Sequence, residues 1–334
     1  MGFVERLDRA QRRFPPLGFP IAVAYKYFDD IGGYLSALLT YYAFVSLFPL
    51  LLLLATALSF VLAGRPDLQR QILDSAVAQV PVLGDQLGDP RSLSGGASGV
   101  AIGLAVSVYG ALGVGNALQH AMNTVWAVPR NVRPNPVLAR ARSVVLVLTA
   151  GLAVLATTAL SAFTAAATTW GPWTKVLSTV LTILVNAFIV LLVFRIGVRQ
   201  GSIRKMLPGA LLAAGAWQGL QTFGVVYVGR VVKNASTSNG VVAFILGLLA
   251  FTYLAAVILV LCAEVNVVRA ERLYPRALLT PFTDDVDLTA ADQETYADQA
   301  RSMRTKGYER IDVTFEPEES GDAQGERGAA GSDP

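Results

Sequence analysis

The chain has 334 residues, of which 53% are hydrophobic and 15% charged, and its mean hydropathy is +0.49. Soluble globular domains carry about 25% charged residues, so this composition excludes an ordinary soluble domain and indicates an integral membrane protein. The net charge of +3 conceals an asymmetry, because residues 1–280 hold 22 Lys and Arg against 10 Asp and Glu, whereas residues 281–334 hold 5 against 14. Basic segments beside apolar ones are typical of membrane topology, so we do not interpret them as nucleic-acid binding.

The N-terminal segment, residues 1–33, is basic and amphipathic, and we expect it to lie on the cytoplasmic surface. It is too long and too polar to precede the core of a cleaved signal peptide. Six apolar stretches follow, and each is long enough to cross a hydrocarbon core of about 30 Å as an α-helix. Their approximate bounds are 34–63, 97–128, 143–169, 176–195, 207–229 and 241–268. The sequence therefore predicts an all-α membrane protein in which residues 34–270 form a bundle of six transmembrane helices.

The loops predict the orientation of this bundle. Sixteen Lys and Arg residues lie near the span ends on the proposed inner side, against six on the outer side. Because Lys and Arg are enriched in cytoplasmic loops, we expect both termini to be cytoplasmic. Apolar residues at helical spacing between Leu68 and Val80 predict a short amphipathic helix in the first outer loop. We expect the acidic tail, residues 271–334, to be cytoplasmic and mostly disordered, apart from a short helix near Ala290 to Met303.

Polar side chains inside the predicted spans are the strongest functional clue, because their burial in a bilayer is costly unless they pair or meet water. Four of them share one face of the second span and form a polar stripe: Asn116, Gln119, His120 and Asn123. The same cytoplasmic half of the bundle holds Tyr41, Tyr42, Asn186, Arg195, Glu264 and Asn266. Two interpretations are open. These residues line a hydrated cavity that opens toward the cytoplasm, or they hydrogen-bond one helix to another.

Two ionisable residues in the spans have specific expectations. His120 is the single histidine of the chain, and we expect a buried neutral side chain that bonds Asn116 or Asn123, with proton relay as the alternative. Glu264 is the one acid within a predicted span. We expect it to form an ion pair with Arg195, with a role toward a head group or a proton as the alternative.

Residues for enzyme chemistry are scarce. One His and one Cys cannot form the usual zinc or dinuclear hydrolase sets. Glycines at 110, 113 and 115 lie inside an apolar span and lack the Lys-Ser/Thr pair of a phosphate-binding loop. We therefore expect no enzyme activity, no catalytic residues, no metal ligands and no cofactor.

Three stretches of the chain are similar to the YihY/BrkB family of bacterial inner-membrane proteins, which includes YhjD-like members. They are LLTYYAFVSLFP at residues 38–49, LPGA at residues 207–210 and CAEVN at residues 262–266. The family's usual last motif has glycine where this chain has Cys262, which predicts a less close helix contact there. The resemblance covers about residues 20–275 and implies a six-helix envelope protein, with suggested links to lipid export and to resistance to host killing. Some relatives are labelled ribonuclease BN, but the missing ligand cluster argues against a nuclease.

These observations favour a transporter or flippase-like protein of the plasma (inner) membrane, acting on an anionic amphiphile such as a lipid or lipid-linked precursor. The polar residues of the spans would line its path, and four arginines would attract the head group: Arg130, Arg133, Arg195 and Arg199. The alternative is a non-transporting envelope scaffold whose acidic tail recruits a soluble protein. The expected partners are membrane lipids and a lipid-like substrate, with a homo-oligomer left open and no nucleic acid.

Overall fold

The computed structural model describes residues 3–61, 67, 97–166, 173–227, 237–278 and 286–315. Within these ranges the protein forms nine α-helices and one 3-10 helix, without a strand. In chain order they are α1 (Phe3–Arg13), α2 (Pro15–Asp29), α3 (Gly32–Val61), α5 (Ala97–Val125), η2 (Arg130–Val132), α6 (Pro136–Ala166), α7 (Trp173–Gly197), α8 (Ile203–Tyr227), α9 (Thr237–Glu271) and α10 (Ala290–Ser302). The all-helical prediction is confirmed for this part of the chain.

In the part of the chain that the structure describes, three helices contain stretches that are long and apolar enough to cross a membrane: Pro136–Thr157 in α6, Val176–Gly197 in α7 and Ile245–Glu271 in α9. On α7, the large apolar side chains of Leu177, Leu184 and Phe188 are exposed on the protein surface, where lipid tails would solvate them. The helices α3, α5 and α8 coincide with the other three predicted stretches, and their crossing of the membrane stays a prediction. The amphipathic helix predicted between Leu68 and Val80 lies outside the described residues.

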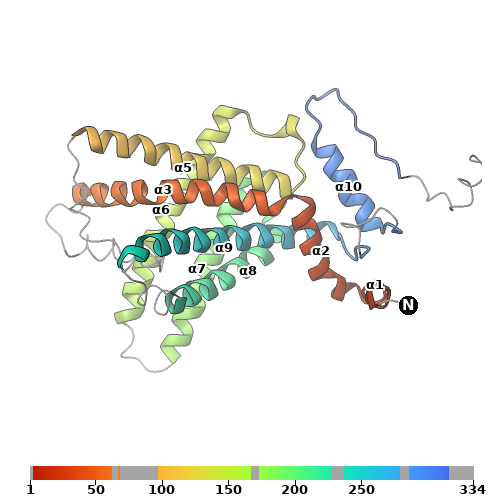
Figure 1. The fold of residues 1–334 in the computed structure, drawn as a ribbon, viewed down its shortest axis with the longest axis horizontal. Coiled ribbons are helices and arrows are strands. Elements are labelled where there is room, and N and C mark those ends of the chain that lie inside the picture. The colour runs from red at the N-terminus through yellow and green to blue at the C-terminus, as the bar shows by residue number, and fades with distance from the viewer. Residues whose placement is uncertain are drawn as a thin grey trace, which may run out of the picture.

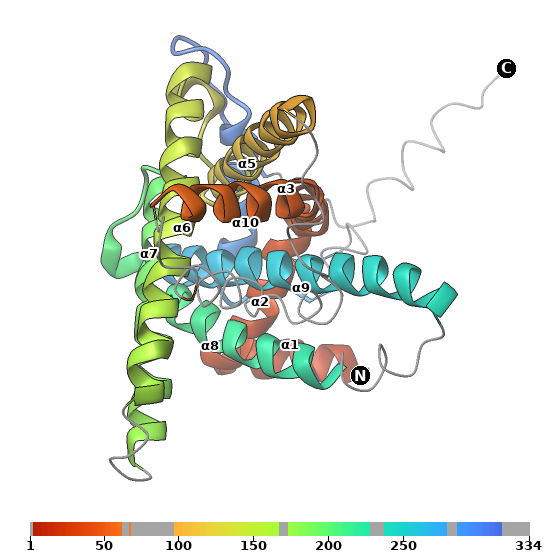
Figure 2. The same ribbon diagram turned by 90° about the vertical axis from the view of Figure 1, so that its left-hand side faces the viewer.

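The helix α9 lies at the centre of the arrangement, in contact with α2, α3, α5 and α8. Figure 1 shows α3, α5, α8 and α9 running lengthwise, and Figure 2 shows α6 and α7 rising steeply across them. The buried core includes side chains of α5 and α9 that are mostly small or medium in size: Ala117, Ala121, Met122, Val125, Val260, Ala263 and Val267. The helices α1, α2 and α10 gather at one end of the long helices (Figure 1).

The contact between α8 and α9 joins two of the sequence stretches that carry the family resemblance. A Cβ atom at Gly209 would lie 2.0 Å from the backbone oxygen of Cys262, so only glycine permits this approach. The backbone N–H of Gly209 donates to Asn266 Oδ1 at 2.7 Å. Gly209 on the opposite helix thus provides the space for a close approach at the Cys262 backbone, and the looser contact expected from Cys262 relative to glycine stays a prediction.

Both terminal segments pack against the helix bundle. Residues Ala22 and Val23 of α2 belong to the buried core, and α2 contacts α9. The tail forms α10 at the predicted position, and Thr289 begins it with a capping box that pairs Thr289 with Asp292. Residues 286–315 of the predicted disordered tail are thus part of the described fold, whereas residues 316–334 lie outside it.

Candidate functional site

A cavity of about 250 Å³ collects much of the predicted polar stripe. Its lining comes from α3, α5, the segment after η2 and the start of α6: Leu38, Tyr42, Asn116, Ala117, Gln119, His120, Asn123, Arg133, Pro134 and Ala139. We call it the stripe cavity. Six of the residues predicted from the sequence therefore meet in one place, although they come from segments up to 91 positions apart, between Tyr42 and Arg133.

Half of the stripe is buried and hydrogen-bonded within the protein. Gln119 is buried, and its side-chain amide donates to the Ala139 carbonyl at 2.9 Å and to the Ser143 hydroxyl at 3.0 Å, both on α6. Asn123 is also buried and donates back to the Gln119 carbonyl at 2.6 Å. Gly115 permits this contact, because a Cβ atom there would lie 2.7 Å from the Cα atom of Ser143. The interpretation as helix-to-helix bonding thus holds for Gln119, whereas Asn123 bonds within α5.

The other half of the stripe is open. Asn116 and His120 are both exposed and face the stripe cavity beside Tyr42. The expectation that His120 is a buried histidine is therefore wrong, because no described helix covers this face of α5. These side chains remain free to meet water or a ligand.

Arg133 gives the stripe cavity its charge. Its Nε donates to the Val128 carbonyl at 2.9 Å, which holds the side chain in the lining. Burial and the neighbouring Arg130 lower the pKa of Arg133, as expected for a cation that lacks a counter-charge. The lining contains no Asp or Glu. The cavity thus offers a guanidinium and several hydrogen-bonding groups to an anion.

The remaining predicted residues lie outside this lining. Tyr41 is 56% exposed and makes an edge contact with Tyr42, with ring centroids 5.2 Å apart. Arg195 and Arg199 are exposed at the end of α7, and Arg195 donates to the Arg199 carbonyl at 3.4 Å. Three others line neither described cavity: Arg130, Asn186 and Asn266.

Glu264 has a different partner from the one predicted. Its carboxylate Oε2 lies 3.7 Å from Lys26 Nζ, and both side chains are buried. Lys26 also pairs closely with Asp30, one helical turn further along α2. The ion pair expected between Glu264 and Arg195 is wrong, because α2 packs against α9 and brings Lys26 to this position. We call Lys26, Asp30 and Glu264 the charge cluster.

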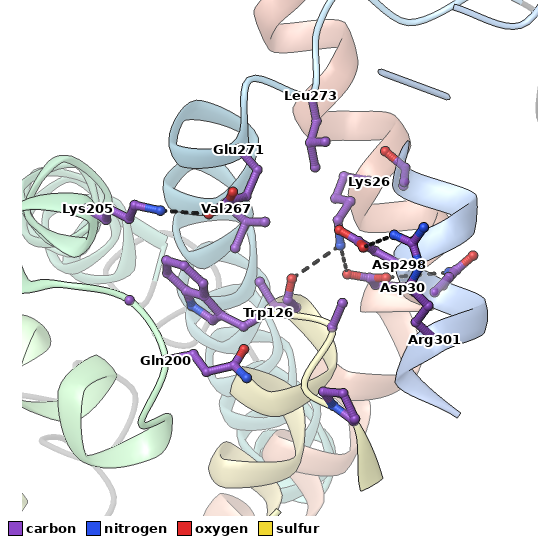
Figure 3. Close-up of a pocket in the computed structure, with 16 residues that line it drawn as sticks. Lys26, Asp30, Trp126, Gln200, Lys205, Val267, Glu271, Leu273, Asp298 and Arg301 are labelled. Carbon is purple, nitrogen blue, oxygen red and sulfur yellow. Dashed lines mark hydrogen bonds and ion pairs between the residues drawn. The ribbon is translucent and has the colours of Figure 1, made fainter. Parts of the chain in front are cut away.

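A second cavity, of about 340 Å³, opens beside the charge cluster. Figure 3 shows Lys26 and Asp30 on one side of it, with Asp298 and Arg301 of α10 nearby, and the Lys205–Glu271 ion pair on the opposite side. Trp126 and Gln200 line it as well. We call it the cluster cavity. It connects two members of the charge cluster to the end of the molecule where α10 lies.

A further buried ion pair fixes the tail. The Arg276 guanidinium, fully buried, pairs closely with Asp292 of α10 and lies 3.0 Å from Asp29 of α2. Burial lowers the pKa of Arg276, but hydrogen bonds and charges from Asp292 and Asp29 outweigh this and raise it overall. Gln299 of α10 donates to the Asp29 carbonyl as well. These contacts hold α10 against α2.

Sequence reasoning missed Lys26, Asp30 and Arg276 as site residues. Lys26 and Asp30 belong to the N-terminal segment, residues 1–33, for which the sequence predicted only a position on the cytoplasmic surface. One signal was present, since Lys26 and Asp30 are four residues apart, a spacing that places two side chains on one helix face. For Arg276 the sequence offers no comparable signal, because its partners are distant in the chain.

A comparison with known families decides the relationship of this chain. A family model described as virulence factor BrkB matches residues 23–284. The chain belongs to the BrkB family. It is therefore a multi-pass membrane protein of that family, and the resemblance inferred from its motifs is confirmed. The match includes the stripe cavity and the charge cluster but ends before α10. No curated protein and no solved structure matches the chain.

Proposed function

We propose that this BrkB-family protein moves an anionic amphiphile, such as an envelope lipid or a lipid-linked precursor, between the leaflets or out of the plasma membrane. In this proposal six helices, α3 and α5 to α9, cross the membrane, and both termini are cytoplasmic. The protein acts as a carrier and not as an enzyme. Among the described residues, no group of three His, Cys, Asp or Glu side chains is placed to hold a metal.

The stripe cavity is the observation that supports this proposal. It combines the Arg133 guanidinium with the exposed side chains of Asn116 and His120, and its lining holds no carboxylate. A volume of about 250 Å³ is below that of pockets that enclose a whole drug-sized molecule, about 300–1,000 Å³. It suits a polar head group whose acyl chains stay among the lipids, beside apolar lining residues such as Leu38.

The alternative, a scaffold whose tail recruits a soluble partner, has less support. The described part of the tail is engaged within the molecule, since α10 is held to α2 through Asp292 and Gln299. Within the described ranges, Asn116 and His120 also form no hydrogen bond to another helix, as a scaffold role for the stripe would require.

Native mass spectrometry of protein purified in mild detergent tests the proposal. We expect the wild type to retain a defined anionic lipid and Arg133→Gln to bind it at least tenfold more weakly, because a hydrogen bond to a charged group contributes about 1.5–3 kcal/mol. The matched control is Arg140→Gln, which removes the same charge from an exposed position nearby that is not part of the lining. An identical, unselective lipid mixture on all three proteins would contradict the proposal.

A further inference from the structure

The charge cluster contains more negative than positive charge. Two carboxyl groups, Asp30 and Glu264, share one ammonium group, Lys26. All three side chains are buried, with exposed fractions of 2%, 0% and 4% respectively. An ionised carboxylate without full compensation is strongly unfavourable in such surroundings. The cluster therefore needs one more positive charge.

Hydrogen bonding identifies where that charge is missing. Lys26 Nζ donates to Asp30 and to the Val125 carbonyl at the end of α5, at 3.2 Å. Its distance of 3.7 Å to Glu264 exceeds that of a hydrogen bond. Neither carboxylate oxygen of Glu264 has a hydrogen-bond partner among the described residues. An ionised carboxylate can only accept hydrogen bonds, so Asp30 and Glu264 can satisfy each other only when one of them carries a proton.

Other ionisable groups around the cluster do not supply the missing charge. Arg276 is already paired with Asp29 and with Asp292. In the lining of the cluster cavity, Lys205 pairs with Glu271, and Arg301 pairs with Asp298 of the same helix. The remaining titratable neighbours are the hydroxyl groups of Tyr27 and Tyr253, and α5 contributes the Val125 carbonyl.

We infer that the charge cluster binds one exchangeable proton, shared between the carboxyl groups of Asp30 and Glu264 and exchanged with water through the cluster cavity. The proton comes from water in the cavity and leaves the same way, so the cluster alternates between a neutral and a singly negative state. Asp30 provides the route by which the proton passes between the charge cluster and the water of the cluster cavity, because it belongs to the cluster and also lines the cavity. Burial raises the pKa of Asp30 although Lys26 opposes this, which agrees with a proton held near this group.

The proton has a mechanical consequence at the contact between α2 and α9. The negative state attracts Lys26 toward Glu264 and tightens this contact, whereas the neutral state weakens the attraction. Glu264 is two residues from Asn266, which binds Gly209 of α8. If the proposed transport function holds, on which this step rests, proton uptake would drive the rearrangement of α2, α8 and α9.

Infrared difference spectroscopy of the purified protein tests proton binding independently of transport. We expect the wild type at neutral pH to show the carbonyl stretch of one protonated carboxyl group, shifted by exchange into heavy water. Glu264→Gln and Asp30→Asn should each lose this signal. The matched control Asp312→Asn removes an exposed carboxylate outside the lining of the cluster cavity and should keep it.

A further variant should change the signal in the opposite direction. Lys26→Gln removes the ammonium group, so the cluster should bind a second proton and the signal should about double. Absence of the signal in the wild type, or an equal signal in all variants, would overturn the inference. Loss of the signal when sodium replaces choline at constant pH would also overturn it, by assigning the site to a metal cation. A normal signal in a protein that retains no anionic lipid would reject the proposed function while leaving the proton site intact.

Discussion

At the residue scale, the protein buries charge in two different ways. Arg276 is fully buried between two carboxylates, Asp292 and Asp29, and each of them accepts a hydrogen bond from its guanidinium. Glu264 is equally buried, but it shares Lys26 with Asp30 and has no hydrogen bond of its own among the described residues. A compensated buried charge fixes structure, whereas an incompletely compensated one is typical of functional sites. This difference separates the tail anchor from the charge cluster.

The raised pKa of Asp30 predicts a specific pH dependence of stability. Burial raises this pKa above its ordinary value of 3.8, against the opposing effect of Lys26. The folded state therefore binds this proton more tightly than the unfolded chain does. The resulting contribution to stability is fully present below pH 3.8 and is lost as the pH rises through the pKa of Asp30 in the folded state.

Asp30→Asn lacks this titration. We expect the melting temperature of the wild type relative to Asp30→Asn to rise as the pH falls from about 8 to about 4. Thermal unfolding followed by tryptophan fluorescence measures both proteins across this range. A difference that does not vary with pH would show that Asp30 is ionised equally in the folded and unfolded states.

At the element scale, glycine positions determine which helices approach closely. Gly115 brings α5 against α6, and Gly113 of α5 accommodates the ring of Tyr42 on α3. Gly209 brings α8 against α9 at the Cys262 carbonyl. Gly215, further along α8, has no atom of another described element within 4 Å of the position its Cβ atom would take. Two glycines of one helix therefore differ in their structural role.

We predict that Gly209→Ala destabilises the protein by about 1–3 kcal/mol or more, because the added methyl group meets the backbone of α9. Gly215→Ala is the matched control and should leave the stability unchanged or raise it by up to about 1 kcal/mol. Unfolding can be followed with a thiol-reactive dye, since Cys262 is buried in the folded protein. Equal stability of the two variants would mean that α8 and α9 do not pack closely at Gly209.

At the scale of the whole molecule, one end of the helix bundle carries the terminal segments and the cluster cavity. The helices α1, α2 and α10 lie there (Figure 1), and the lining of the cluster cavity includes residues of α2 and α10. The stripe cavity is close to the same end, because His120 and Asn123 belong to the last turns of α5 and Arg133 follows it. Both cavities would therefore open toward one side of the membrane.

We predict that this side is the cytoplasm. In a Cys262→Ala background, single cysteines at the exposed positions Arg140 and Arg310 should react with an impermeant maleimide in inverted membrane vesicles and not in intact cells. A cysteine at Trp173, which is 82% exposed at the opposite end of α7, should show the reverse pattern. Labelling of Arg310→Cys in intact cells would place the tail outside and contradict the proposed orientation.

Much of the fold could be predicted from the sequence, because its causes are local. Long apolar stretches can satisfy their backbone groups in a bilayer only as helices, and the helices α6, α7 and α9 follow from this rule. The stripe was visible for the same reason, since Asn116, Gln119, His120 and Asn123 recur with the period of one helix. The capping box of Thr289 and Asp292 likewise depends on residues three apart, so the position of α10 was predictable.

Only the tertiary structure decided which distant groups meet. Lys26 and Glu264 are separated by most of the chain, and the packing of α2 against α9 determines that they pair, in place of Glu264 and Arg195. The tertiary structure also decides that Arg276 pairs with Asp292 and Asp29. These ion pairs hold α10, a part of the acidic tail, against α2. Helix periodicity determines which side chains share a face of one helix. Which other helix covers that face depends on the packing of helices that are far apart in the sequence. The sequence by itself thus determined the class of the protein and its polar stripe, and the tertiary structure determined which charges are compensated.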